Sequence, residues 1–138
     1  EVNPYDLPLS IRKFVTIASV IASNCEVMIF DEPTAGQDLE GLARLSKLNK
    51  ILTERGKAIV TITHDMEFVA ENYERTIVMC QKKVLADGKT KDVFFQKDIM
   101  EKAMLKQPVI VRIANQIGMK ENTLDIKKVA KFVADNRG

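Results

Sequence analysis

The chain has 138 residues, of which 46% are hydrophobic and 29% are charged, and its formal net charge is +2. These values suit one soluble domain with a real core, or a piece of a larger domain. No apolar run approaches the roughly 20 residues that a membrane-spanning helix needs. Cys25 and Cys80 lack the spacing of metal ligands, so we expect free packing thiols in a reducing cytosol.

The charge is unevenly distributed along the chain. Residues 1–88 carry 10 basic and 13 acidic side chains, whereas residues 89–138 carry 11 basic and 6 acidic ones. A basic tail can bind nucleic acid or an anionic membrane surface. Because the lysines are scattered and few aromatic residues are available to stack on bases, we expect short helices with solvated faces and no nucleic-acid binding.

The first predicted element is a helix. Apolar residues recur at helical spacing over residues 11–21, and Ser10 is a suitable N-cap. Arg12 and Lys13 lie near its start. They could attract a phosphate as flexible charges, or they could simply face solvent, and the sequence leaves both possibilities open.

The central feature of the sequence is an apolar run that ends in two acids. Val27 to Phe30 lead directly into Asp31 and Glu32, and a loop with proline and glycine follows. Such a run is typical of a strand buried on both faces of a parallel sheet. Ligands bind beyond the carboxyl ends of these strands. Two carboxylates there are costly without a partner, and a hard cation bound to phosphate oxygens is a natural one.

The only histidine follows a second apolar strand. An amphipathic helix over residues 39–55, ended by Gly56, leads to a predicted strand over residues 58–62. His64 then comes 33 residues after Asp31, which is the length of one helix and one strand. A lone histidine is usually structural, but this spacing places it at the same sheet edge as the two acids and favours a functional role.

The rest of the chain changes from strands to helices. Strands are predicted over residues 75–79 and 83–88 with a tight turn between them, which completes an α/β pattern. Helices are predicted over 98–105, from Pro108 to Gly118, and after a capping Asp125. The apolar stripes of the last two helices comprise Ile110, Ile113, Ala114 and Ile117, and Ile126, Val129, Ala130 and Val133.

Taken together and in order, these motifs resemble the C-terminal half of an ABC-transporter ATPase domain. Val27 to Glu32 resembles a Walker B strand followed by a catalytic glutamate, and Pro33 to Asp38 resembles the D-loop. His64 resembles the switch histidine of these ATPases. The tail, with Gln107-Pro108 and Ile117-Gly118-Met119, is similar to the helical extension of the ATPases of energy-coupling factor (ECF) transporters.

Two parts of the family pattern are missing or altered. No Gly-x-x-x-x-Gly-Lys-Ser/Thr phosphate loop (Walker A) occurs, and the glutamine loop is absent. The family signature Leu-Ser-Gly-Gly-Gln falls on Leu7 to Ile11, where only Leu7 matches. Pro8 lacks an N–H, and Leu9 has a side chain where glycine allows close approach to phosphate. We therefore expect the nucleotide site that this signature serves to be impaired. We also expect the chain to be a truncated piece of a longer protein.

The resemblance also implies roles for individual residues in the intact parent. It implies hydrolysis of ATP with Mg²⁺ to power uptake of a small nutrient. Asp31 would hold Mg²⁺ through water, Glu32 would polarise the attacking water, and His64 would contact the γ-phosphate. Asp38 would line the interface with a second ATPase domain, and Ser10 belongs to the degenerate signature that contacts nucleotide. The implied partners are a second ABC ATPase and transmembrane subunits, at the cytoplasmic face of the cell membrane.

The resemblance implies a partial RecA-like (P-loop NTPase) parallel α/β sheet that lacks the phosphate-loop strand. Residues 1–97 would form the C-terminal part of the ATPase domain, and residues 98–138 a small α-helical extension. Because the phosphate loop is missing, we expect these residues alone to be inactive. Because the missing strand would leave an open edge, we also expect them to form homo-oligomers or strand-swapped assemblies through residues 58–62 or 75–79.

Two alternatives remain open from the sequence. One is an ABC-type ATPase outside membrane transport that acts on nucleic acid or ribosomes, which the basic tail permits. The other is a non-catalytic interaction domain on the same scaffold. Glu32 and His64 argue against the second alternative, because a scaffold needs neither side chain.

Overall fold

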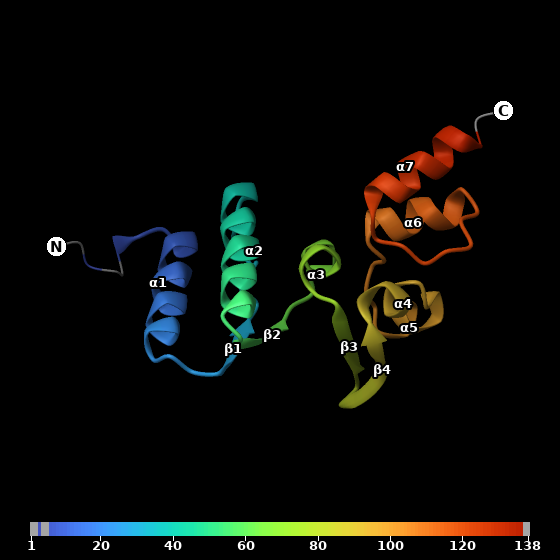
Figure 1. The fold of residues 1–138 in the computed structure, drawn as a ribbon. Coiled ribbons are helices and arrows are strands. Elements are labelled where there is room, and N and C mark those ends of the chain that lie inside the picture. Colours follow the sequence, from blue (N-terminus) through green and yellow to red (C-terminus); the bar gives the residue numbers. More distant parts are fainter. Residues whose placement is uncertain (1–2, 4–5, 137–138) are drawn as a thin grey trace. The chain divides into compact units, whose positions relative to one another are not determined.

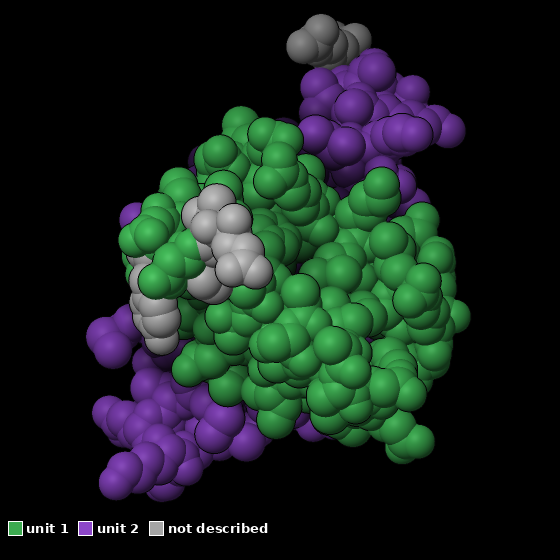
Figure 2. Space-filling model, turned by 90° about the vertical axis from the view of Figure 1, so that its left-hand side faces the viewer, with its two compact units in different colours: residues 1–64 green, residues 65–138 purple. Residues whose placement is uncertain are grey.

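The computed structural model describes residue 3 and residues 6–136. Residues 1–64 form one compact unit and residues 65–138 form another (Figure 2). The predicted division between an ATPase part, residues 1–97, and a helical extension, residues 98–138, stays a prediction. Within the described residues, no helix is both long and apolar enough to cross a membrane. The elements of unit 1 are α1 (Leu9–Ala22), β1 (Val27–Asp31), α2 (Leu39–Glu54) and β2 (Ala58–Ile62) (Figure 1).

Unit 1 is built around a parallel pair of strands joined by a helix. β1 pairs with β2 in parallel, in a register that runs from Val27 opposite Ala58 to Asp31 opposite Ile62. The connecting α2 packs against β2, as expected for a βαβ unit. The predicted α/β fold with a small parallel sheet is confirmed, and the carboxyl ends of both strands lie at one edge.

Only one face of this two-stranded sheet is covered. Met28 and Phe30 are buried on one face of β1, whereas the alternate positions of both strands are open. The exposed fractions are 58% for Val27, 64% for Ile29, 48% for Val60 and 55% for Ile62. The prediction that β1 is buried on both faces is therefore wrong, because the residues that the structure describes supply a covering layer on one side only. We call these four residues the open face.

The helix boundaries follow local capping chemistry. α1 begins two residues earlier than predicted, with Pro8 as N-cap, and the Pro8 carbonyl accepts from the backbone N–H groups of Ile11 and Arg12. The prediction that Ser10 caps this helix is wrong, since Ser10 lies inside the first turn. α2 matches its prediction more closely, because Asp38 caps it by accepting from the Gly41 N–H at 2.7 Å.

Unit 2 combines a hairpin with short helices. Its elements are α3 (Met66–Asn72), β3 (Arg75–Cys80), β4 (Lys83–Lys89), α4 (Thr90–Phe94), α5 (Lys97–Lys102), α6 (Val109–Gln116) and α7 (Ile126–Asp135). β3 and β4 pair antiparallel through the predicted turn, where Gln81 and Lys82 both have positive φ. The core cluster comprises Val69, Val78, Val93, Phe94, Met100 and Val111.

The tail forms helices close to the predicted positions, but α5 ends at Lys102 instead of at residue 105, and the buried faces differ in part. Asp125 caps α7 by accepting from the Lys127 N–H at 2.8 Å. In α6 the buried positions are Val111 and Ala114, while Ile113 is exposed. The predicted apolar stripes are therefore wrong at Ile113 in α6 and at Ile126 and Ala130 in α7, which are exposed. A short helix with many apolar residues offers more than one possible buried face.

The hairpin provides a test of pH-dependent stability. The Arg75 guanidinium donates two hydrogen bonds, each 2.8 Å long, to the Asp87 carboxylate across the strands. The hydrogen bond from Arg75 lowers the pKa of Asp87 below its ordinary value. A lowered folded-state pKa contributes stability above the unfolded pKa, and this stability is lost as the pH falls through the folded pKa. We expect the hairpin to weaken as the pH falls below about 4. Carboxyl NMR titration should give Asp87 a depressed midpoint that Arg75→Gln returns to normal, and a midpoint unaffected by Arg75→Gln would contradict this account.

The open face provides a test of association. Burying each of its large aliphatic side chains is worth about 1.5–3 kcal/mol, and no other strand of the described chain pairs with the second edge of β2. We expect the 138-residue chain to form homo-oligomers, or strand-swapped assemblies, through this face and edge. Light scattering should show less association for Ile29→Thr/Val60→Thr, which keeps β-branched residues at two paired positions.

The matched control for this test is Ile126→Thr, which removes an exposed isoleucine from α7 instead. It should leave association unchanged. A wild-type chain that stays monomeric at micromolar concentrations would show that the open face needs no cover.

Candidate active site

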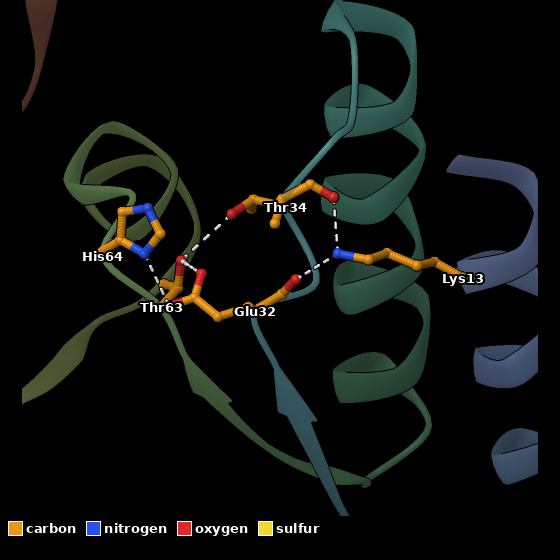
Figure 3. Close-up of polar contacts among 6 residues, drawn as sticks. Lys13, Glu32, Thr34, Thr63 and His64 are labelled. Atoms are coloured by element: carbon orange, nitrogen blue, oxygen red, sulfur yellow. Dashed lines mark hydrogen bonds and ion pairs between the residues drawn. The ribbon is translucent and has the colours of Figure 1, made fainter. Parts of the chain in front are cut away.

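The carboxyl edge of the β1–β2 sheet brings together side chains that are distant in sequence. Asp31 ends β1, and the backbone N–H of Glu32 continues the ladder by donating to the Ile62 carbonyl at 2.8 Å. Thr63 and His64 follow directly after β2 and lie beside Glu32 (Figure 3). The register of the parallel pair therefore places the acid and the histidine at one edge, as their spacing predicts.

Glu32 and His64 are in direct contact. His64 Nδ1 lies 2.8 Å from Glu32 Oε1, and the histidine ring is largely exposed (Figure 3). A carboxylate can only accept, so the hydrogen of this bond is carried by Nδ1. The contact fixes the orientation and tautomer of the neutral ring and leaves Nε2 directed away from Glu32 as an acceptor. In the imidazolium form, both nitrogens donate.

The other carboxylate oxygen of Glu32 contacts one hydroxyl group, which in turn contacts a second. Thr63 Oγ1 lies 3.4 Å from Glu32 Oε2, and Thr34 Oγ1 lies 3.2 Å from Thr63 Oγ1. Thr34 is buried in the loop that follows β1. A chain of polar contacts thus joins this loop, the end of β2 and the acid. The sequence analysis missed both threonines, because threonine is common at strand ends and only the register shows that these two meet.

Glu32 itself has an unusual backbone conformation. Its φ is +44°, in the left-handed region that costs a residue with a side chain roughly 1–2 kcal/mol. Such conformations persist where surrounding contacts hold them, and they are concentrated at functional sites. This conformation breaks the strand alternation at the end of β1 and allows the side chain to meet Thr63 and His64.

α1 is tied to the same loop by two side chains. Lys13 Nζ donates to the carbonyl oxygens of Glu32 at 2.7 Å and of Ala35 at 2.6 Å (Figure 3). Gln37 Nε2 donates to the Ser10 carbonyl at 3.2 Å. The solvent-facing alternative for Lys13 is therefore wrong. No pattern in the sequence indicates this contact, since it depends on how α1 lies beside the loop.

The remaining predicted site residues have different surroundings. The Asp31 carboxylate is exposed and makes no hydrogen bond or ion pair with any described residue. Asp38 is exposed and serves as the N-cap of α2. Ser10 contributes its backbone carbonyl through the contact with Gln37. The structure thus joins Glu32 with His64, leaves Asp31 available and uses Asp38 to begin a helix.

The donor groups suit a metal ion that is bound mainly by a phosphate substrate. Among the described residues, no three histidine, cysteine, aspartate or glutamate side chains are grouped as a protein-only metal site. Mg²⁺ commonly uses one or two carboxylates and completes its shell with water and substrate phosphates. The unengaged Asp31 carboxylate beside Glu32 fits that mode of binding.

Curated relatives of the chain are ATP-binding proteins of ABC transporters, although no protein-family model matches. The relative from Caldanaerobacter subterraneus is 37% identical over 116 residues, which are 84% of this chain and 20% of that protein. The relative from Staphylococcus aureus is 41% identical over 110 residues, which are 80% of this chain and 19% of that protein. The relative from Clostridium perfringens is 35% identical over 127 residues, which are 92% of this chain and 22% of that protein. The chain therefore spans about a fifth of the length of these relatives.

Solved structures give the same assignment. The protein cbiO1 of Clostridium perfringens, part of the ABC transporter complex cbiONQ, is 33% identical with a TM-score of 0.60. The match covers 81% of this chain and 45% of that one. An inward-facing metal-chelate type ABC transporter matches with a TM-score of 0.67 and 21% identity, over 74% of this chain and 41% of that one, which supports the fold alone. The chain is therefore homologous to ABC transporter ATP-binding proteins, and it matches a C-terminal part of their ATPase fold.

Proposed function

We propose that these residues form the hydrolytic half of an ATPase subunit of an ECF-type ABC transporter, which powers uptake of a small nutrient. The observation that carries the proposal is the Glu32–His64 contact at the carboxyl edge of a parallel sheet, in a chain related to ABC ATP-binding proteins. Membership of cbiO1 in a transporter complex supports membrane subunits as partners. The protein would act at the cytoplasmic face of the membrane.

In this proposal, Glu32 is the general base. Its carboxylate accepts a proton from the water that attacks the γ-phosphate of ATP. The hydrogen bond from His64 Nδ1 holds one carboxylate oxygen, and Thr63 lies beside the other. As an imidazolium, His64 can donate from Nε2 to a phosphate oxygen while Nδ1 keeps Glu32 in place.

Asp31 is the residue available to hold Mg²⁺ through water. When bound, the metal ion neutralises charge that develops on the phosphate oxygens. The exposed Asp31 carboxylate has no competing partner among the described residues, so it can accept hydrogen bonds from metal-bound water.

The remainder of the ATP site would come from other residues. The chain contains no phosphate-loop motif and aligns with 45% of the cbiO1 chain, so a phosphate cradle lies outside these 138 residues in this proposal. The segment that carries the cradle would cover the open face. Asp38 would line the contact with a second ATPase domain. The signature stretch would serve its site poorly, because Pro8 occupies the N-cap of α1 in place of a free N–H donor.

The first test of this function is Glu32→Gln in the full-length protein with a competent partner. Glutamine keeps the size of the side chain but is a far weaker base. We expect kcat to fall roughly 10²-fold or more while ATP binding is kept. Glu40→Gln, at an exposed position of α2, is the matched control and should keep normal turnover. Unchanged turnover in Glu32→Gln would give Glu32 a structural role.

The second test concerns the 138-residue chain alone. A phosphate loop supplies most of the backbone donors to phosphate, and none is present here. We expect no measurable ATP hydrolysis and at best weak binding of Mg²⁺-ATP, measured by calorimetry beside the full-length protein. A micromolar dissociation constant for this chain would contradict the proposed dependence on a separate cradle.

A further inference from the structure

Lys13 makes contacts that differ from those of the lysines in surface ion pairs. Lys57 also donates to a backbone carbonyl, that of Asn24 at 3.1 Å, but its second hydrogen bond goes to the side chain of the same residue. Lys97 and Lys128 pair with carboxylates on exposed surfaces, as is usual for lysine. Lys13 instead donates to two backbone carbonyls, at 2.7 Å and 2.6 Å, and its side chain is half-buried. The two acceptors, Glu32 and Ala35, are the first and last residues of one tight turn. The ammonium therefore joins both ends of that turn to α1.

This turn is the part of the backbone that orients the proposed general base. Its internal hydrogen bond, from the Ala35 N–H to the Glu32 carbonyl, is long at 3.3 Å. Glu32 has a positive φ that a residue with a side chain adopts only when neighbouring contacts hold it. The shorter bonds from Lys13 provide such a contact. Without them, the Glu32 backbone could relax and turn its carboxylate away from the end of β2.

Glu32 is thus held from two sides by different elements. Its backbone carbonyl is held by Lys13 of α1, while its carboxylate contacts Thr63 and His64 beyond β2 (Figure 3). The side-chain contacts are partly exposed, and one of them is 3.4 Å long. They are not sufficient to fix the acid if the backbone moves, so both sets of contacts are needed.

We propose that Lys13 is a positioning residue for Glu32, and that it connects the placement of α1 to the orientation of the proposed general base. This inference rests on the proposed function of Glu32. Lys13 acts through the turn and touches no reacting atom. Its loss should therefore reduce kcat and leave the KM for ATP nearly unchanged.

The test compares three variants of the full-length protein with its competent partner. Lys13→Met keeps the aliphatic stem and removes the ammonium, and Lys13→Arg restores a cation with several donors. Lys47→Met removes an exposed lysine of α2 and is the matched control. We expect kcat to fall roughly 10- to 100-fold in Lys13→Met. Lys13→Arg should recover most of the activity, and Lys47→Met should match the wild type.

A second measurement separates positioning from catalysis. Nitrogen NMR of His64 at a pH where the ring is neutral reports whether Nδ1 carries the hydrogen that Glu32 accepts. We expect Lys13→Met to shift the signal toward the Nε2–H tautomer as the contact weakens, and the other two variants to keep the wild-type signal. A changed signal in Lys13→Met together with normal turnover in Glu32→Gln would uphold positioning and reject the proposed function.

Three results would overturn the inference about Lys13. One is a Lys13→Met protein with wild-type kcat and a wild-type His64 signal. Another is reduced kcat with an unchanged His64 signal, because Lys13 would then act by a route other than Glu32. The third is a Lys13→Arg protein as impaired as Lys13→Met, which would show that cationic donors to the turn are not what matters.

Discussion

The hydrogen bond from the Glu32 backbone N–H to the Ile62 carbonyl is the interaction on which the site depends. It extends the parallel ladder of β1 and β2 by one step beyond the last residue of β1. A shift of one residue in this pairing would send each side chain of one strand to the opposite face of the sheet. Glu32 would then face different residues of β2, and the contact with His64 would be lost. The chemistry of the edge therefore depends on the burial of Met28 and Phe30, which sets the register.

The sequence predicted the elements of this edge well, because each leaves a local signal. The apolar run before Asp31, the helix that begins at Leu39 and the spacing to His64 each leave a pattern in the sequence, and the structure agrees with them. The errors have local causes too. Ser10 is a good capping residue, but the helix starts earlier, with Pro8 as its N-cap and without a side-chain hydrogen bond to its first turn. Ile113 shows that hydrophobic spacing alone does not select the buried face of a short helix.

The contacts that sequence reasoning missed share a different feature. The missed residues are Lys13, Thr34 and Thr63. Their contacts use backbone atoms and hydroxyl groups, and the two partners in each contact are 19 or more residues apart in the sequence. Nothing in the pattern of a lysine on a helix or a threonine in a loop indicates such contacts, since they depend on the placement of whole elements. Likewise, the apolar run of β1 correctly indicated a strand but wrongly indicated burial on both faces. The cover for its second face is not supplied by these residues, and no pattern within the chain shows this.

The left-handed backbone of Glu32 has a consequence for how this protein can change. Glycine adopts such a conformation without steric cost, so a substitution to glycine would relieve local strain at this position. The same substitution would remove the carboxylate that, among the described residues, contacts His64. Folding and chemistry therefore favour different amino acids at one residue, which is the situation that produces a trade-off between stability and activity. Selection for thermal resistance alone, without selection for turnover, would be expected to lose this glutamate before it lost the histidine.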